Sequence, residues 1–318
     1  MPNYSGVWSL PTQMQAVAAE NWPSPPVYGL FGGGNTGSQV NVIDYIDITT
    51  TGNAADFGDL TTTRWLGTAC ASSTRGIFIA GQSSNVIDYV SFATQGNATD
   101  FGDVTPGTAN SYIGASSNDT RGVFAAVNAS SSSDIINYIT IATTGNSQDF
   151  GNLLRDAAEM SASCASTTRA LWGGEYNPST GVTYNTIQYV TIASTGNATD
   201  FGDLISTTKT AGALSSSTRG VFAGGQNANG GADLNIISYI TIATTGNAVD
   251  FGDLMAANSI PVGCSSKTRG VFSYGGYSNT NTLQYITIAT TGNALDFGEL
   301  SVSRRGESAC SNGHGGLA

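Results

Sequence analysis

The chain has 318 residues, of which 40% are hydrophobic, 10% are charged and 41 are glycine; this mixture is typical of a globular β protein rich in turns. Its 22 acidic and 11 basic residues give a formal net charge of −11, which repels phosphate and argues against DNA or RNA as a partner. No apolar run approaches the ~18 residues of a membrane-spanning helix, and the start MPNYSGVW lacks the regions of a signal peptide. We therefore expect a soluble protein that neither inserts into a membrane nor carries an export signal.

Residues 1–26 form a segment that differs from the rest of the chain. Ser9 can cap a short helix that Pro11 opens, and the sequence PSPP at 23–26 ends it. One stripe of this helix and its flanks carry large apolar side chains, namely Leu10, Met14, Val17 and Ala18 with Trp8 and Trp22 on either side. The segment either packs under the following domain or docks to a neighbouring subunit, because Trp and Met are effective interface anchors.

From residue 27 the chain is built of repeats. The sequence TTGNAADFGDL at 50–60 returns as TQGNATDFGDV, TTGNSQDFGNL, STGNATDFGDL, TTGNAVDFGDL and TTGNALDFGEL, at intervals of 44 to 51 residues. Each repeat also contains a strand such as TRGVFAGG, an alternating strand such as IISYITIA, and a strand of small residues such as TACASS. A period of this length with short strands is typical of a β-propeller with one four-stranded blade per repeat. We predict an all-β, six-bladed propeller over residues 27–318.

The two ends of the repeat region indicate how the ring closes. The first strand, VYGLFGGG at 27–34, has no small-residue strand before it, whereas the chain ends with an unmatched copy of that strand. In this last copy, Arg304 matches Arg64 and Cys310 matches Cys70. The C-terminal strand is therefore predicted to complete the first blade and to remove an exposed sheet edge.

Insertions collect in one class of loop. The spacing from the Arg of TRG to the Tyr of the next strand varies from 14 to 20 residues, while the Tyr, Gly-Asn and Phe of the following hairpin keep constant spacing. These variable loops are expected on one face, where repeat proteins usually meet partners. The longest, 173–186 and 224–235, offer four contact residues: Tyr176, Tyr184, Asn227 and Asn229.

The repeated sequence GNAxDFGD has a structural and a functional interpretation. In the structural one, the Gly takes a positive φ, Asn and Asp bond nearby amides, the Phe fills the space between blades, and the Arg of TRG pairs with the carboxylates. In the functional one, Asn53, Asp56, Asp59 and their copies bind calcium. Asn152 and Glu299 depart from the pattern, so we favour the structural interpretation and predict no cofactor or metal.

The cysteines and the single histidine are not predicted to carry out chemistry. Cys70, Cys164, Cys264 and Cys310 occupy matching places in four repeats, which favours small buried core residues over disulfides or a metal site. His314 stands in a Gly-rich tail and is expected to be exposed.

No catalytic motif is found in the sequence. It contains no GxSxG, HExxH or P-loop. Its DFG copies share the D-x-G core of the sialidase Asp-box but lack the preceding Ser or Thr and the later aromatic residue, and its arginines and tyrosines repeat identically instead of forming one converging site. We predict that the protein is not an enzyme; a glycan-binding propeller or a sialidase-like enzyme is the alternative.

Two resemblances extend these predictions. The order R....AC.SSTRG.F..GG resembles the kelch repeat over residues 27–313, although the Trp that kelch blades carry near the last strand is replaced by the Phe of DFG. Kelch-like repeats imply a binding platform, and a cellular adaptor of that type would normally carry an oligomerisation domain as well. The segment SGVWSLPTQMQAVAAENWP and the sequences GNATDFGDL and TRGVFAGG are similar to structural proteins of marine tailed bacteriophages, cyanophages among them.

The phage resemblance implies a non-enzymatic virion component, assembled in the host cytoplasm. It would be a tail protein or a capsid decoration, held to other virion proteins through residues 3–26. Its loops would then contact a neighbouring subunit, or a glycan or protein of the host surface.

Overall fold

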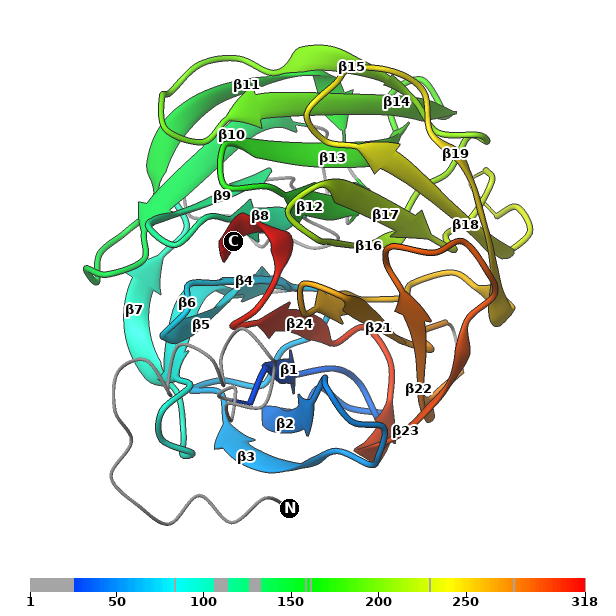
Figure 1. Ribbon diagram of the computed structural model, residues 1–318. Helices are drawn as coiled ribbons and strands as arrows, with labels where there is room; N and C mark the ends of the chain where they lie inside the picture. Colours follow the sequence, from blue (N-terminus) through cyan, green and yellow to red (C-terminus); the bar gives the residue numbers. More distant parts are fainter. Residues whose placement is uncertain are drawn as a thin grey trace, which may run out of the picture.

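The computed structural model describes residues 26–82, 84–105, 114–125, 133–157, 159–160, 162–228, 230–276 and 278–317. These residues form six four-stranded antiparallel sheets around a central axis (Figure 1). Within the described residues, the single helical element is the 3-10 turn η1 (Gly315–Leu317). The prediction of an all-β, six-bladed propeller is confirmed. The short helix predicted between Ser9 and Trp22 lies outside the described residues.

The strands of each blade follow one another from the axis to the rim. Blade 1 contains β24 (Ser308–Ser311), β1 (Tyr28–Gly32), β2 (Val42–Asp47) and β3 (Ala55–Asp59), and blade 2 contains β4 (Thr68–Ala71), β5 (Arg75–Gly81), β6 (Ser84–Ser91) and β7 (Thr99–Asp103). Blade 3 contains β8 (Ala115–Ser117), β9 (Arg121–Ala125), β10 (Ser133–Thr140) and β11 (Gln148–Ala157), and blade 4 contains β12 (Ser163–Ala165), β13 (Arg169–Asn177), β14 (Val182–Thr191) and β15 (Thr199–Asp203). Blade 5 contains β16 (Gly212–Ser215), β17 (Arg219–Ala223), β18 (Leu234–Thr241) and β19 (Val249–Asn258), and blade 6 contains β20 (Gly263–Ser265), β21 (Arg269–Ser273), β22 (Thr280–Thr287) and β23 (Leu295–Arg304).

The last strand of the chain is the innermost strand of the first blade. β24 pairs with β1 so that Cys310 lies opposite Leu30, in the register that places Cys70 opposite Ile77 in blade 2. Arg304 is buried and forms an ion pair with Asp44 at 3.2 Å, as Arg64 does with Asp88. The closure predicted from the matching of the two ends is therefore confirmed.

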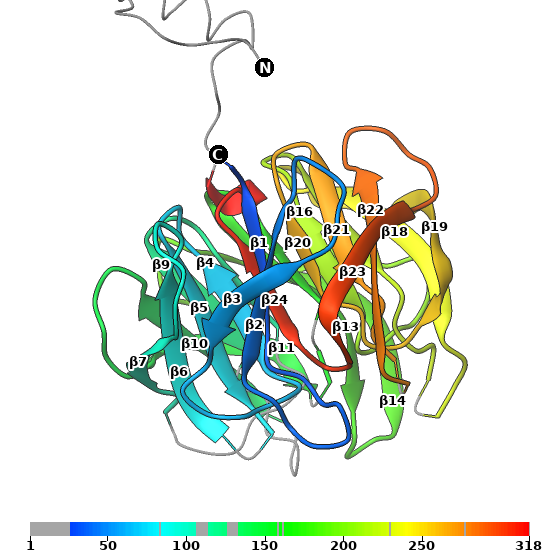
Figure 2. The same ribbon diagram turned by 90° about the horizontal axis from the view of Figure 1, so that it is seen from below.

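The ring has two faces that carry different connections (Figure 2). On the turn face lie the turns between first and second strands and the six Gly-Asn turns between third and fourth strands. On the loop face lie the described connections between second and third strands, among them residues 33–41 and 178–181, together with the described connections from one blade to the next. The described variable loops therefore share one face, as predicted, while the start of β1 and the C-terminal turn η1 lie on the other.

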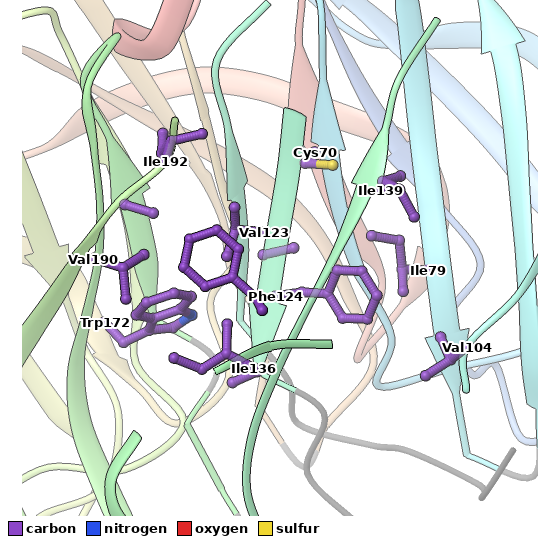
Figure 3. Packing of buried hydrophobic residues seen from close by; sticks show 14 of the residues in the cluster. Cys70, Ile79, Val104, Val123, Phe124, Ile136, Ile139, Trp172, Val190 and Ile192 are labelled. Carbon is purple, nitrogen blue, oxygen red and sulfur yellow. The ribbon is translucent and has the colours of Figure 1, made fainter. Parts of the chain in front are cut away.

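The core lies between adjacent blades. Figure 3 shows one such cluster, in which Val123 of blade 3 lies on the side of Trp172 and Val190 of blade 4, while Phe124 points to the other side, toward Ile79 of blade 2. Each Phe of DFG is buried and meets the Tyr of its own blade edge to face, with ring centroids 5.8 to 6.1 Å apart. In the cluster of blades 4 and 5, for example, Phe201 is buried together with residues of the next blade, among them Ile240 and Ala248. The predicted place of the Phe between blades is confirmed.

Candidate functional site

The repeated sequence forms a joint between neighbouring blades. In blade 5, the backbone N–H of Gly246 donates to Phe201 O of blade 4 at 2.8 Å, and that of Ala248 donates to Asp203 O at 2.8 Å. The side-chain oxygen of Asn247 accepts the backbone N–H of Asp203 at 3.0 Å. The same Asn-to-backbone hydrogen bond occurs at the other five joints, in the pairs Asn97 with Asp59, Asn146 with Asp103, Asn197 with Asn152, Asn293 with Asp253, and Asn53 with Glu299. The six copies are thus one structural part used six times.

The Gly of DFG allows the two chains of a joint to approach closely. Gly202 has φ +146°, and a Cβ at this position would lie 2.5 Å from Gly246 O in the next blade. The other five joints place the Gly of DFG against the Gly of the following Gly-Asn turn in the same way. A side chain here would collide with backbone, so the joint requires glycine.

The joint also bears on the calcium interpretation. Each Asn oxygen proposed as a ligand accepts a backbone N–H of the preceding blade, which satisfies that oxygen within the fold. Among the residues that the structure describes, no group of three or more His, Cys, Asp or Glu side chains is arranged to hold a metal ion. The departures Asn152 and Glu299 keep the joint because their backbone N–H, and not their side chain, makes the contact.

The prediction that the Arg of TRG pairs with the repeated carboxylates is wrong. The guanidinium of Arg219 lies over the Tyr239 ring, 4.5 Å from its centroid, and donates to the carbonyls of Ile288 and Ala289 in the next blade at 2.9 Å. The same stacking and a carbonyl of the next blade engage Arg75, Arg121, Arg169 and Arg269. The sheet fixes the carbonyl groups at the strand ends, so they attract the guanidinium of each arginine. The Asp side chains of DFG lie instead on the outermost strand of each blade. These arginines therefore connect neighbouring blades.

The four cysteines are buried and free, which confirms their predicted structural role. Their sulfur atoms pack against glycines of the next blade; a Cβ on Gly122, for example, would lie 2.7 Å from Cys70 Sγ. Between blades 3 and 4 the equivalent residues are Ser116 and Ala170, so a smaller side chain faces a larger one. Burial raises the pKa of Cys70 to about 12, which keeps this thiol neutral and unreactive.

The axial channel of the ring is narrow. Its walls are the inner strands, and its lining consists of Ala, Ser, Gly and Cys side chains with Leu214 and His314. The cavity at the turn-face end has a volume of about 50 Å³, and a second cavity at the loop-face end, lined in part by Thr68, Pro261 and Val262, also has about 50 Å³. Each has room for a few water molecules, whereas ligand pockets usually measure roughly 300 Å³ or more.

His314 is not exposed, contrary to the prediction from the sequence. It is half-buried, and its Nε2 lies 3.0 Å from Ala71 O at the mouth of the channel on the turn face. The tail is Gly-rich because Gly315 and Gly316 pack directly on the carbonyls of Ser216 and Ser117. The sequence around His314 therefore encodes a close-packed turn instead of a free tail.

The longest predicted loop, 173–186, is largely a β-hairpin. β13 continues to Asn177 and β14 begins at Val182, so only residues 178–181 form the exposed tip. Tyr176 is 8% exposed, with Lys209 Nζ 4.8 Å from its ring centroid, and Tyr184 is half-buried beneath Arg155 at 4.4 Å. Both tyrosines thus take part in holding the hairpin.

Two charged residues from neighbouring blades support this hairpin, and the sequence analysis missed them. Arg155 of blade 3 forms an ion pair with the buried Glu175, and Lys209 pairs with Glu159 at 2.6 Å. The feature of the sequence that could have identified these two residues is that most other repeats have no matching charged residue. In the loop at 224–235, Asn227 is exposed, and Asn229 lies outside the described residues.

The anchor residues Trp8, Leu10, Met14, Val17 and Trp22 also lie outside the described residues. The structure does describe where the chain enters the ring: the backbone N–H of Tyr28 donates to Asn312 Oδ1 at 2.8 Å, and Val27 lies against Gly313. Both contacts are on the turn face, next to the C-terminal turn (Figure 2). The described part of the chain contains no helix long and apolar enough to cross a bilayer.

The sequence matches no protein-family model, and no curated protein matches it.

Proposed function

We propose that the protein is a non-enzymatic structural component of a bacteriophage virion. The propeller is displayed on the particle surface as a tail protein or capsid decoration, and residues 3–26 attach it to other virion proteins. The observation that carries this proposal is the placement of the chain: it enters the ring at Val27 on the turn face, opposite the variable loops. An anchor on one face leaves the other face free to contact a partner.

The closed ring supports the assignment of residues 3–26 to attachment. Each of the six described sheets has four strands within residues 28–311, so the described blades are complete without residues 3–26. It nevertheless contains Trp8, Met14 and Trp22, and aromatic anchors of this kind commonly contribute ~2 kcal/mol or more each to an interface.

The chemistry of the ring supports a non-enzymatic role. The axial channel, where six-bladed enzymes gather their reacting groups, is lined mainly by small uncharged side chains, and its two cavities have a volume of about 50 Å³ each. The repeated Arg, Tyr and Asn side chains are engaged in stacking and in hydrogen bonds between blades. These groups maintain architecture, which is the main requirement of a particle protein.

The loop face is the proposed contact surface for a neighbouring subunit or for a host glycan or protein. One of its described elements is the hairpin of β13 and β14, which the Arg155–Glu175 ion pair and the contact of Lys209 with the Tyr176 ring hold in place. A rigid hairpin with an exposed tip at 178–181 loses little conformational entropy on binding.

Truncation tests the anchor. A protein beginning at Pro26 should fold as a monomeric propeller and fail to join particles, and Trp8→Ala and Trp22→Ala should each weaken incorporation. Leu295→Ala, which removes an exposed apolar side chain from the outer strand β23, is the control and should be incorporated normally. Normal incorporation of the truncated protein, or its failure to fold, would show that the anchor assignment is wrong.

Shortening the hairpin tests the loop face. Replacing residues 178–181 by a two-residue Asn-Gly turn keeps the pairing of Asn177 with Val182, so thermal melting should be unchanged. Assembly or adsorption to host cells should weaken. Unaltered assembly and adsorption would show that the hairpin tip is not part of the proposed contact surface.

A further inference from the structure

The last residues of the chain fill the mouth of the axial channel on the turn face. We call residues 312–317 the C-terminal plug. Its turn η1 packs against the inner strands β12 and β16, and the backbone of Gly315 and Gly316 lies directly on the carbonyls of Ser216 and Ser117. The fit depends on the absence of side chains, because a Cβ at either glycine would overlap these oxygen atoms.

His314 fastens the plug with both ring nitrogens. Nδ1 accepts the backbone N–H of Gly316 at 3.1 Å, so the neutral ring carries its proton on Nε2. Nε2 then donates to Ala71 O at 3.0 Å, with Ser117 Oγ at 3.4 Å. This arrangement uses one tautomer of the neutral ring and has no place for a second ring proton.

We propose that the C-terminal plug is a pH-sensitive latch, which protonation of His314 at Nδ1 releases from the channel mouth. The proton comes from solvent and forms an N–H bond at Nδ1, and the hydrogen bond from Gly316 N–H to that nitrogen is lost. Two N–H groups then face each other at the former hydrogen-bond distance, and the ring becomes a cation beside the small, uncharged Ala, Ser and Cys side chains of the channel mouth. Release returns the charged ring to water.

The groups around the His314 ring determine the direction in which its pKa is shifted. Burial lowers the pKa of His314 from its ordinary value of 6.5, while the hydrogen bond to Ala71 and the charge of Asp119 oppose this shift. The other titratable side chains lining this end of the channel are the thiols Cys70, Cys164, Cys264 and Cys310, which burial keeps neutral. Strands β12 and β16 and the turn η1 bring no other ionisable side chain.

The sign of the pH dependence follows from this lowered pKa. The unfolded or released tail binds a proton more readily than the latched tail, so the latch is stable above pH 6.5 and is lost as the pH falls through the pKa of the latched state. The plug also holds the start of the propeller, through Asn312 with Tyr28 and Gly313 with Val27. Acidification should therefore loosen the point at which residues 1–26 leave the ring.

Nuclear magnetic resonance tests the latch directly, because the protein contains one histidine. In protein labelled at the histidine ring, the midpoint of the His314 titration should lie below pH 6.5, and the protection of the Gly316 amide against hydrogen exchange should fall by roughly tenfold or more at the same midpoint. Titration at or above the ordinary value, or protection of Gly316 that persists through the titration, would overturn the proposal.

Two variants distinguish release of the C-terminal plug by protonation of His314 from a general loss of stability at low pH. His314→Gln can still donate to Ala71 O but cannot be protonated, so its Gly316 protection should not depend on pH between 5 and 8. Gly316→Ala should leave the plug released at pH 7.5, with His314 titrating at its ordinary value and the blades intact by circular dichroism. A pH-dependent loss of protection in His314→Gln, or a protected plug in Gly316→Ala, would contradict the proposal.

Discussion

Asn247 Oδ1 accepts the backbone N–H of Asp203 at 3.0 Å across the boundary between two blades. Because the donor is backbone, the residue at the position of Asp203 can vary without loss of the joint, as Asn152 and Glu299 demonstrate. Each copy of the repeated sequence thus contributes its Gly-Asn half to one joint and its DFG half to another. The ring is complete only when every copy has both neighbours.

Gly202 lies so close to the backbone of Gly246 that one added methyl group should lower the stability strongly. Gly202→Ala should lower the free energy of unfolding by on the order of 2 to 4 kcal/mol, since it combines an unfavourable φ with a collision against Gly246 O. Asp200→Asn, at an exposed position of the same strand, is the control and should change it by less than about 0.5 kcal/mol. Urea unfolding measures both variants, and equal effects would mean that the joint is not tightly packed.

The calcium interpretation can be tested at the same joint. Asn247→Ala should lower the free energy of unfolding by about 1 kcal/mol, the usual contribution of one such hydrogen bond, and EDTA should leave the melting temperature of the unmodified protein unchanged. If calcium were bound at this turn, EDTA would lower the melting temperature of the unmodified protein more than that of Asn247→Ala. Scanning calorimetry distinguishes the two results.

The packing of sulfur against glycine predicts a specific rescue. Gly122→Ala should cost roughly 1 to 3 kcal/mol because the new methyl group meets Cys70 Sγ, and adding Cys70→Ser should recover part of this loss, as in the natural pair Ser116 and Ala170. Gly220→Ala provides the matched control.

Gly220 faces Cys164, so Cys70→Ser should leave the destabilisation of Gly220→Ala unchanged. Denaturant unfolding of the single and double variants gives the coupling energy for each pair. Equal rescue of both glycine variants would contradict the pairing of each cysteine with one glycine.

The number of blades and the closure of the ring could be predicted because they depend on spacing along one chain. Arg304 and Cys310 repeat Arg64 and Cys70, and this identifies the strand that belongs to blade 1 without knowledge of any contact. The joint itself could not be predicted, because a repeat does not reveal which half of one copy meets which half of the next.

The partners of individual side chains were predicted less well than the fold. Arg219 binds carbonyls that the sheet brings together, and backbone acceptors leave no mark on the sequence. His314 is placed by Gly315 and Gly316, whose close packing is visible only once the carbonyls of Ser216 and Ser117 are located.

One buried acid should make stability depend on pH. Burial raises the pKa of Glu307 above its ordinary value of 4.5, although the charge of Arg304 acts in the opposite direction. The folded protein then retains a proton that the unfolded chain releases, so the contribution of Glu307 to stability is full below pH 4.5 and declines as the pH rises through the folded-state pKa.

Glu307→Gln removes this dependence. The variant should gain stability relative to the unmodified protein as the pH is raised from 5 to 8, as measured by the midpoint of urea unfolding. Glu299→Gln, at an exposed position, should show no such trend. A difference between Glu307→Gln and the unmodified protein that stays constant over this range would mean that Glu307 is ionised in the folded protein.

The most direct test of the proposed role is the position of the ring in an imaged virion. Electron cryo-microscopy of particles should show a six-bladed ring on the surface with its turn face, where Val27 and the plug lie, toward the particle and the β13–β14 hairpin pointing outward. Particles without this ring, or a ring whose loop face is bound to the particle while the turn face is free, would contradict the account.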